Sequence, residues 1–549
     1  MKLVKKIYTF ITAAACCAAI SGIMPFSSSA EESVKTYGDL SYVTSDSDGD
    51  RIYDYIAIID CNESVTKIEI PAEIEDIPVV EIKSSAFNGC ANLTSIIIPD
   101  SVTSIGDFAF ENCSGLTSIT IPDSVTSIGD HAFYNCSSLT SITVSENNKY
   151  FSSLNGVLFN KDKTELVTYL IGNERTEYAI PDSVTSIGDR AFYKCSSLTS
   201  IIIPDSVTSI GDHAFYNCSS LTNITIPDSV TSIGDHAFHN CSGLTSITIP
   251  DSVTSIGDHA FYNCSSLTSI TVSENNKYFS SLNGVLFNKD KTDLITYPIG
   301  NERTEYTIPD SVTSIGNFIF YNCSSLTSIT IPDSVTSIGN FAFYNCSSLT
   351  SITIPDSVAS IGNSAFYNCS SLTNIKLPDV IDIISGNTFR DCSSLLNIII
   401  PDSVTSIKEC AFYNCSNLTS ITIPDSVASI ENSAFYNCTS LKSITLNNPD
   451  CEISNDKDTI PETAVICGYE NSTAQAYAER YYKRFVAIED IGDISGNGKI
   501  DLYDAIEIAK AIMGMRTFTE EEKLIADFNK DVTVDLYDAI EIARTLLPK

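Results

Sequence analysis

The chain has 549 residues, with 68 acidic against 32 basic side chains, and its formal net charge is −36. This charge opposes binding to nucleic acid or to an anionic membrane, because contacts with phosphates need clustered Lys and Arg. The chain also has only 5 His and no Trp, which leaves few groups for acid-base catalysis. We therefore expect no nucleic-acid partner, and the composition argues against an enzyme.

Residues 1–30 have the pattern of a secretory signal peptide. Lys2, Lys5 and Lys6 precede an apolar run over 7–23, and small residues over 28–30 form a cleavage site. No later segment reaches the run of about 18 apolar residues that a membrane helix needs. The sequence thus predicts a secreted, extracellular protein without membrane insertion.

A repeat of 23 residues fills the middle of the chain. It is clearest over 226–248, IPDSVTSIGDHAFHNCSGLTSIT, and it occurs 13 times between about residues 70 and 445. A fixed period of this length indicates a solenoid, whose coils bury their apolar faces by stacking. Leu244 to Ile249 alternates as a strand does, and Pro250 ends it. We expect a strand on one side of each coil and a turn or short strand on the other.

One cysteine recurs in each repeat, three residues from both a Phe and a Leu. The thirteen are Cys90, Cys113, Cys136, Cys195, Cys218, Cys241, Cys264, Cys323, Cys346, Cys369, Cys392, Cys415 and Cys438. This spacing favours a small buried filler over a disulfide framework, since parallel Cβ vectors on stacked coils disfavour bridging. Cys61, Cys410, Cys451 and Cys467 lie outside this column, and the last two are the most plausible disulfide pair.

Two nearly identical inserts of 36 residues interrupt the repeat, at about 145–180 and 273–308. Equivalent positions in the two inserts are 128 residues apart, which indicates an internal duplication. Asn155-Gly156 is a turn signal between alternating runs. Each insert is therefore predicted to add a hairpin to the rod.

With these inserts and their NGVLFNKD segment, the repeat resembles the BspA-like leucine-rich repeats of bacterial cell-surface and secreted proteins. The resemblance covers about residues 37–488 and implies a β-rich leucine-rich-repeat solenoid. We expect an N-terminal cap over 31–80, the solenoid over 81–446, and a C-terminal cap and linker over 447–489. In this cap, Asn471 or Ser472 would begin an Ala-rich helix that covers the last coil.

Repetition turns single surface residues into columns, and each column leaves two hypotheses open. Twelve coils carry Asp after Pro, and six carry Asp after Gly. These carboxylates would either bind cations weakly or form turns and keep the surface soluble. One repeat position holds His131, His213, His236 and His259. These side chains would either bind a transition metal or simply be tolerated at the surface. Nine coils carry Tyr after Phe, and this ladder would stack on a ligand or be half buried within the rod.

A different duplication begins after Asp490. The segment DLYDAIEIA occurs at 501–509 and again at 535–543, and a loop of oxygen donors precedes each copy. Carboxylate, amide and hydroxyl groups stand at positions 1, 3, 5, 9 and 12 of each loop, as in the calcium loop of an EF-hand. These residues are Asp493, Ser495, Asn497, Asp501 and Asp504, then Asp527, Asn529, Asp531, Asp535 and Asp538.

Two such loops, each followed by a helix, resemble a type I dockerin over 490–549. The resemblance implies two calcium ions, further held by the carbonyl groups of Lys499 and Thr533, and a partner, the cohesin module of a scaffoldin. The residues that would face the cohesin are Leu502, Tyr503 and Lys510 in one copy and Leu536, Tyr537 and Arg544 in the other. Because the two Leu-Tyr pairs are identical, either helix is expected to dock.

The loops depart from the family pattern at two positions. Ser495 replaces a stronger Asp or Asn donor, and Val532 stands where the loop normally needs Gly. A β-branched residue at positive φ costs roughly 1 to 2 kcal/mol. We expect the second calcium site to be the weaker one.

These features favour a non-catalytic, secreted cellulosome component whose solenoid binds a protein or a polysaccharide. Two alternatives remain. The chain is a dockerin-bearing enzyme or accessory factor in polysaccharide catabolism, or it is an adhesin for a host or matrix surface. A glycosidase needs two carboxylates about 5 to 10 Å apart in a shaped cleft, and the repeat predicts no such cleft.

Overall fold

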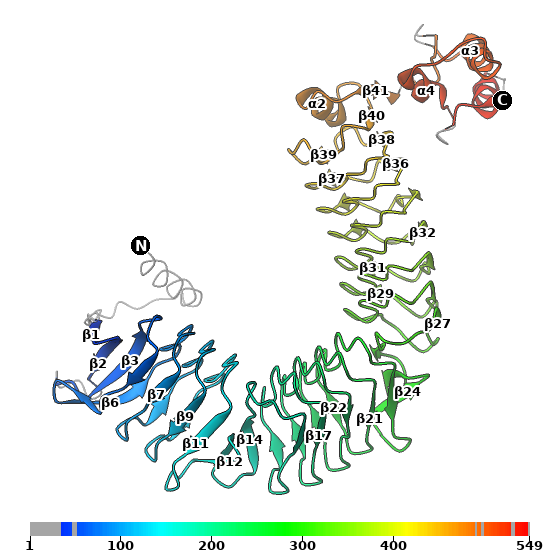
Figure 1. Ribbon diagram of the computed structural model, residues 1–549. Helices are drawn as coiled ribbons and strands as arrows, with labels where there is room; N and C mark the ends of the chain where they lie inside the picture. The colour runs from blue at the N-terminus through cyan, green and yellow to red at the C-terminus, as the bar shows by residue number, and fades with distance from the viewer. Residues whose placement is uncertain (1–33, 47–51, 489–490, 496–498, 529–532, 547–549) are drawn as a thin grey trace, which may run out of the picture.

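The computed structural model describes residues 34–46, 52–488, 491–495, 499–528 and 533–546. The predicted signal peptide lies outside these ranges. The described residues form a stack of β coils that runs as an open arch, with three helices beyond its C-terminal end (Figure 1). Within them, no helix is both long and apolar enough to cross a membrane. The predicted solenoid is confirmed.

The N-terminal end of the stack is closed by an antiparallel sheet. β1 (Lys35–Tyr37) pairs with β2 (Leu40–Ser45), and β2 pairs with β3 (Tyr55–Cys61). β3 then pairs in parallel with β6 (Ile77–Ile82), which β5 (Glu73–Ile74) also flanks. This cap covers the edge of the first coil, an edge that would otherwise expose unpaired backbone groups.

Most coils contribute one strand to each of two parallel columns, and residues 23 apart pair, as Ile119 does with Ile142. At Ile315 the second column continues through an isolated bridge to Ile338. The first column holds β4 (Lys67–Glu69), β7 (Ser95–Ile97), β9 (Ser118–Ile121), β11 (Ser141–Val144), β15 (Glu177–Ala179), β17 (Ser200–Ile202), β19 (Asn223–Ile224), β21 (Ser246–Ile249), β23 (Ser269–Val272), β27 (Glu305–Thr307), β28 (Ser328–Thr330), β30 (Ser351–Thr353), β32 (Asn374–Lys376), β34 (Asn397–Ile398), β36 (Ser420–Ile423), β38 (Ser443–Leu446), β40 (Val465–Gly468) and β41 (Phe485–Ala487).

The second column consists mainly of two-residue strands. After β6 it holds β8 (Ser104–Ile105), β10 (Ser127–Ile128), β14 (Glu165–Thr168), β16 (Ser186–Ile187), β18 (Ser209–Ile210), β20 (Ser232–Ile233), β22 (Ser255–Ile256), β26 (Leu294–Thr296), β29 (Ser337–Ile338), β31 (Ser360–Ile361), β33 (Ile383–Ile384), β35 (Ser406–Ile407), β37 (Ser429–Ile430) and β39 (Glu452–Ile453). The expected strand and short strand are thus both present in most coils.

The inserts add more than the predicted hairpins. In the first insert β12 (Phe151–Leu154) and β13 (Val157–Asn160) form an antiparallel hairpin around Asn155-Gly156, as predicted. The chain then continues through β14 and β15, which join the two columns as a further coil. The second insert repeats this with β24 (Phe279–Leu282), β25 (Val285–Asn288), β26 and β27. A hairpin alone would leave its outer strand unpaired, and the extra coil pairs it.

The stack therefore extends beyond the 13 coils that contain the recurring cysteine. Five strands of the first column, β4, β15, β27, β40 and β41, belong to coils from the caps and inserts that lack it. In Figure 1 the direction of the stack changes near β24 and β27, at the second insert.

The core is built from columns of identical side chains. Phe215 and Phe238, for example, stack with their ring centroids 5.1 Å apart, and both are fully buried. Cys218 is equally buried, and its thiol lies 3.1 Å from the carbonyl oxygen of Phe192. The predicted role of the recurring cysteines as core fillers is confirmed. The most plausible disulfide pair is not bridged, since Cys451 and Cys467 both remain thiols.

The apolar core is divided into three clusters, and the divisions fall at the two inserts. The first cluster runs from Leu40 to Leu170, the second from Val157 to Leu286, and the third from Val285 to Ala478. Each insert supplies residues to the cluster on either side of it. The inserts therefore separate the solenoid into three packed segments.

The C-terminal end of the stack is covered by helix α2 (Thr473–Arg480). Ser472 caps this helix by accepting a hydrogen bond from the backbone N–H of Gln475 at 3.2 Å. Tyr477 and Ala478 bury their side chains in the third cluster. The predicted capping helix is confirmed, and the choice between Asn471 and Ser472 falls on Ser472.

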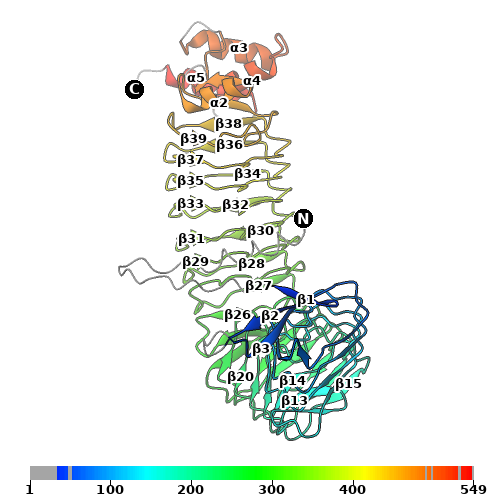
Figure 2. The same cartoon turned by 90° about the vertical axis from the view of Figure 1, so that its left-hand side faces the viewer.

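Three further helices, α3 (Leu502–Ile512), α4 (Glu520–Ala526) and α5 (Leu536–Thr545), lie beyond α2 (Figure 2). Helices α3 and α5 occupy the duplicated segments, as predicted. Helix α4 was missed, although Thr519 and Glu522 form a capping box at its start, a signal that the sequence carries.

Candidate functional site

The two duplicated segments fold in the same way where each loop meets its helix. Asp501 caps α3, with Oδ1 accepting from the backbone N–H of Tyr503 at 2.7 Å. Asp504 reaches back, and its Oδ2 accepts from the N–H of Asp501 at 2.7 Å. Asp535 and Asp538 repeat both bonds at the start of α5, at 2.7 and 2.9 Å. These capping boxes hold two carboxylates beside each loop.

The first loop brings three of its predicted ligands together around a buried carboxylate. Asp504 is 0% exposed, and its Oδ1 accepts from the backbone N–H of Ser495 at 2.9 Å. The hydroxyl of Ser495 in turn donates to Oδ1 of Asp493 at 3.1 Å. Asp504 forms no ion pair with a side chain in the described ranges. Burying a carboxylate without a positive partner is costly, and a hard cation bound by these oxygens would offset that cost.

The second loop is described only in part. Asp538 is also 0% exposed, and Asp527 directly follows α4. Asn497, Asn529, Asp531 and Val532 lie outside the described residues. Among those described, no group of three or more His, Cys, Asp or Glu side chains forms a metal site by itself. Lys499 and Thr533, whose carbonyl groups are further predicted ligands, lie within the described ranges.

The predicted docking residues form two equal exposed surfaces. Leu502, Tyr503, Leu536 and Tyr537 are between 57% and 70% exposed, which is unusual for such apolar side chains. They lie in the first turns of α3 and α5, whose opposite faces pack together through Ile508 and Ile542.

The two basic residues predicted beside these surfaces lie one turn or more further along the helices. Lys510 pairs with Glu507, and Arg544 pairs with Glu541, at 2.7 and 2.6 Å. Both pairs have the same spacing, so the two helices present matching charges as well as matching apolar side chains.

Along the solenoid, the Asp residues that follow Gly are part of the stacking. Oδ1 of Asp212 accepts from the backbone N–H of Asp235 in the next coil at 2.8 Å, and Asp235 accepts from Asp258 in the same way. These carboxylates thus satisfy backbone donors between coils. This ladder accounts for the column without a bound cation.

The aromatic columns are also packed against themselves. Tyr321 and Tyr344 stack at 4.8 Å between centroids, and His239 stacks between Tyr216 and Tyr262 at 4.5 and 4.8 Å. A ring whose two faces are covered by neighbouring coils offers a ligand only its edge. The half-buried packing that we considered for this column is therefore the one observed.

The histidines cluster where three consecutive coils carry them. His213 and His236 stack at 4.8 Å, and Nδ1 of His236 lies 3.2 Å from Nδ1 of His239. Burial and the neighbouring His236 lower the pKa of His239 to about 4. Burial also lowers the pKa of His213 and of His259. Burial therefore favours the neutral form of His213, His239 and His259.

Comparison with known families agrees with this geometry. A model of the BspA type leucine-rich repeat region matches residues 57–169, 171–288, 300–416 and 359–457, which together exceed half of the chain. The chain belongs to the BspA-type leucine-rich repeat family. A model of the dockerin type I domain matches residues 491–547. This C-terminal domain is a type I dockerin, a kind of module that binds calcium and docks onto cohesins.

Several solved structures are similar to the BspA-type solenoid. A leucine-rich repeat protein from Eubacterium ventriosum is 26% identical, covering 78% of this chain and 93% of its own, with a TM-score of 0.44. A leucine-rich cell surface protein from Faecalibacterium prausnitzii is 29% identical, with coverage of 78% and 97% and a TM-score of 0.39. A leucine-rich repeat protein from Bacteroides ovatus is 29% identical, covering 79% of this chain and 100% of its own, with a TM-score of 0.36. No curated protein matches the chain.

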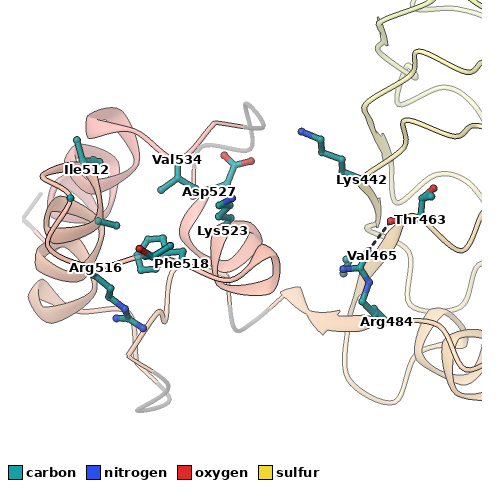
Figure 3. A pocket seen from close by; sticks show the side chains of 13 residues that line it. Lys442, Thr463, Val465, Arg484, Ile512, Arg516, Phe518, Lys523, Asp527 and Val534 are labelled. Carbon is teal, nitrogen blue, oxygen red and sulfur yellow. Dashed lines mark hydrogen bonds between the residues drawn. The ribbon is translucent and has the colours of Figure 1, made fainter.

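The dockerin sits against the C-terminal cap through α4. Ile525 packs against Val465 and Val486 at the edge of the solenoid, and its carbonyl oxygen accepts from the N–H of Gly492 at 2.7 Å. Beside this contact lies a groove of about 600 Å³, lined by Lys442 of the last repeat, Arg484 of the cap and dockerin residues such as Phe518 (Figure 3). The two Leu-Tyr pairs do not line the groove. Contact with the cap thus leaves both docking surfaces uncovered.

Proposed function

We propose that this BspA-type protein is a non-catalytic, secreted component of a cellulosome. Its dockerin binds a cohesin of a scaffoldin in a calcium-dependent way, and its solenoid binds a protein or a polysaccharide. The observation that carries the proposal is the pairing of two buried carboxylates, Asp504 and Asp538, with two exposed Leu-Tyr pairs on the same helices. The dockerin would place the protein outside the cell, at a cellulosome or a cell surface.

Each loop would hold one calcium ion. In the first, the ligands would be Asp493, Ser495, Asn497, Asp501 and Asp504 with the carbonyl of Lys499. In the second, they would be Asp527, Asn529, Asp531, Asp535 and Asp538 with the carbonyl of Thr533. When bound, the ions would neutralise the carboxylates and fix each loop to its helix. Asp501 and Asp535 would each bind an ion and also cap the helix that follows the loop.

The docking residues act mainly through buried apolar area. Leu502 and Tyr503, or equally Leu536 and Tyr537, would enter a hydrophobic patch on the cohesin, with Lys510 or Arg544 at the rim. Because the pairs are identical and both uncovered, one cohesin can dock in two orientations. The bound protein would then hold its arch of coils away from the scaffold.

The solenoid supports binding better than catalysis. Its Asp ladder is used for backbone hydrogen bonds and its aromatic columns for stacking. These columns therefore supply no pair of carboxylates with distinct acid and base roles, which a glycosidase needs. Adhesion to a substrate, a neighbouring cell or a matrix is the remaining role for so long a surface.

The decisive experiment compares the full chain with a chain that ends at residue 489. In calcium, the full chain is expected to bind a panel of type I cohesins, and chelation or truncation is expected to abolish binding. Binding that survives the truncation would overturn the proposal. In parallel, the truncated solenoid is tested on plant polysaccharides, mucins and matrix proteins, and release of reducing sugar would show an enzyme instead.

A further inference from the structure

A cavity of about 150 Å³ lies where the first insert joins the stack. One wall is the coil of Cys136, including His131 and Phe133. Another is the insert, including Tyr169, and the third is the start of the following coil, including Arg190. A cavity of this size has room for about five water molecules or for one small organic ligand.

The cavity exists because the backbone ladder between coils is interrupted there. In the preceding coil, the N–H groups of Phe108, Phe110 and Asn112 donate to carbonyls of the next coil at 2.8 to 2.9 Å. The equivalent amides of the next coil belong to His131, Phe133 and Asn135. Within the described ranges these three make no backbone bond to the coil that follows.

The interruption has a definite cause in the insert. The carbonyl of Ala191, which would continue the ladder, accepts instead from the N–H of Tyr169 at 2.7 Å. The insert thus takes the place of one coil on that side of the stack. Three backbone donors are left facing a space that a stacked coil would otherwise fill.

A buried hydroxyl adds to this unmet hydrogen-bonding capacity. Tyr169 is only 3% exposed, and its hydroxyl has no hydrogen-bond partner within the described residues. A buried polar group without a partner is costly, and such groups are rare in folded proteins. Tyr169 lines the cavity, so a ligand there can supply the missing partner.

The rim of the cavity carries both charges and two aromatic edges. Asp130 and Asp189 are exposed carboxylates, and Arg190 forms no ion pair with a described side chain. Tyr134 and Tyr193 share a hydrogen bond of 2.7 Å between their hydroxyls. Carboxylates disfavour an anion, while free amides and Arg190 disfavour a cation. Hydroxyl groups suit this site, since they donate to carboxylates and accept from amides.

We propose that this cavity binds one neutral sugar residue, at the end of a glycan chain. The sugar hydroxyls would accept from the amides of His131, Phe133 and Asn135, exchange hydrogen bonds with Tyr169, and bridge Asp130 and Arg190. The inference rests on the proposed function, in which the solenoid binds a protein or a polysaccharide. It chooses a glycan as that ligand and this cavity as the binding site.

The second insert supplies a natural control. The equivalent cavity is only about 40 Å³, and it is lined by Tyr297, Phe318 and Ile319, where the first has Tyr169, Arg190 and Ala191. The ring of Phe318 packs edge-on against Tyr262 at 5.4 Å. The larger apolar side chains fill the space, and the guanidinium is absent. The Tyr hydroxyl without a partner among the described residues recurs there at Tyr297, so the first junction is distinguished by its larger space and by Arg190.

The test titrates the full chain, in calcium, with free xylose, glucose, galactose, mannose and arabinose, followed by ligand-observed NMR and calorimetry. One or more of these sugars is expected to bind at one site per chain. Tyr169→Phe is expected to weaken that binding about tenfold, the effect of one lost hydrogen bond. Its melting temperature is expected to stay equal or rise, because the unmet hydroxyl is removed.

Two variants separate the site from the fold. Arg190→Phe introduces the residue that the second junction already tolerates, and it is expected to abolish sugar binding with the melting temperature kept. Tyr297→Phe, the matched change at the small cavity, is expected to leave binding unchanged. Equal sugar binding in wild type, Y169F and R190F would overturn the inference. So would a result in which none of the five sugars binds to the wild type.

The outcome is distinguishable from failure of the proposed function. All three variants leave the dockerin intact, so their calcium-dependent binding to cohesins is expected to match the wild type. If cohesin binding and retention on polysaccharides persist in R190F, the cavity is not the glycan site while the cellulosome role stands. If cohesin binding fails in the wild type, the proposed function fails whatever the cavity binds.

Discussion

The carboxylate of Asp504 accepts a hydrogen bond of 2.7 Å from the backbone N–H of Asp501, and this bond holds a fully buried negative charge where the first loop ends. Asp538 and Asp535 repeat the relationship at 2.9 Å. Buried carboxylates of this kind stabilise a fold only when a positive partner is present. The first two predictions concern that partner and the surface it supports.

Calcium is expected to bind at two sites of unequal strength. Val532 stands at the position of the second loop that normally takes Gly, which costs roughly 1 to 2 kcal/mol, or about 5- to 30-fold in affinity. Calorimetry of the full chain is expected to resolve a tight and a weaker site. Asp504→Asn should remove the tight site and Asp538→Asn the weak one.

Chelation supplies the control for this prediction. Removing calcium is expected to lower the melting temperature of the dockerin and to leave the solenoid transitions in place, because no predicted ligand lies before Asp493. Two sites of equal affinity would contradict the unequal pair. A solenoid transition that shifts with calcium would show ligands elsewhere.

Cohesin binding is expected to tolerate the loss of either docking surface and not of both. Replacing Leu502 and Tyr503 by Ala should weaken binding only about twofold, since the second surface remains. Replacing all four of Leu502, Tyr503, Leu536 and Tyr537 should weaken it more than 100-fold, because buried aromatic anchors dominate such interfaces. Surface plasmon resonance on an immobilised cohesin measures both effects.

Tyr482→Ala is the matched control for those variants. Tyr482 is a Tyr of the C-terminal cap that is 97% exposed and lies outside α3 and α5. Its replacement should leave cohesin binding unchanged. If one Leu-Tyr pair accounts for all of the binding, the two surfaces are not equivalent.

The thiols of the repeat column are expected to be unreactive while the protein is folded. Burial raises the pKa of these groups, to about 12 for Cys346 and Cys438, so the reactive thiolate is scarce at pH 8. A thiol reagent added to native protein should modify Cys410 alone, because its side chain is partly exposed. Mass spectrometry should then find the remaining thiols modified only after denaturation. Rapid modification of Cys346 in native protein would contradict the packed core.

The histidine cluster is expected to destabilise the solenoid in acid. Burial holds the pKa of His239 at about 4, below its ordinary value of 6.5, so protons bind the unfolded state more readily. The contribution of His239 to the free energy of unfolding is fully present above pH 6.5 and is lost as the pH falls toward 4. Because the ring is partly exposed, the effect is on the order of 1 to 2 kcal/mol.

His239→Tyr tests this directly, since Tyr occupies the same position in the neighbouring coils at Tyr216 and Tyr262. The variant is expected to melt at a higher temperature than the wild type at pH 5 and at a similar one at pH 8. Equal differences at both pH values would show that packing, and not protonation of His239, determines the change.

The parts of the fold that repeat were predictable from the sequence. Apolar spacing identified the strands and the buried cysteines, and the resemblance to the BspA-like C-terminal cap implied the capping helix, with Asn471 or Ser472 at its start. Spacing predicted Asp501 and Asp504 as calcium ligands, and this stays a prediction, while the hydrogen bonds by which they cap α3 were not predicted. The sequence left open whether Cys451 and Cys467 form a disulfide, and both remain thiols, because proximity in sequence says little about where buried thiols point.

An asparagine ladder went unnoticed. Asn345 has a φ of 59°, and its side-chain amide donates to Oδ1 of Asn322 at 2.8 Å, while Asn368 donates to Asn345 at 2.6 Å. Asn tolerates positive φ better than other residues with side chains, and stacked amides bond to one another. The Asn that precedes ten of the thirteen column cysteines was the available signal, but one repeat alone does not show that its backbone is left-handed.

The two inserts act as joints between three separately packed cores. The buried column of Phe rings is interrupted at each joint, and outer aromatic rings such as Tyr134 and Tyr193 stack across it at 4.8 Å. We therefore expect tension along the arch to be relieved at the joints first, one segment at a time. The two duplicated inserts also make the length of the solenoid adjustable. Because residues 128 apart occupy equivalent places, an unequal exchange between the two copies would remove or add a whole segment and rejoin the strands in register. The reach of this protein from its scaffold could thus change in a single genetic step, with both caps and the dockerin untouched.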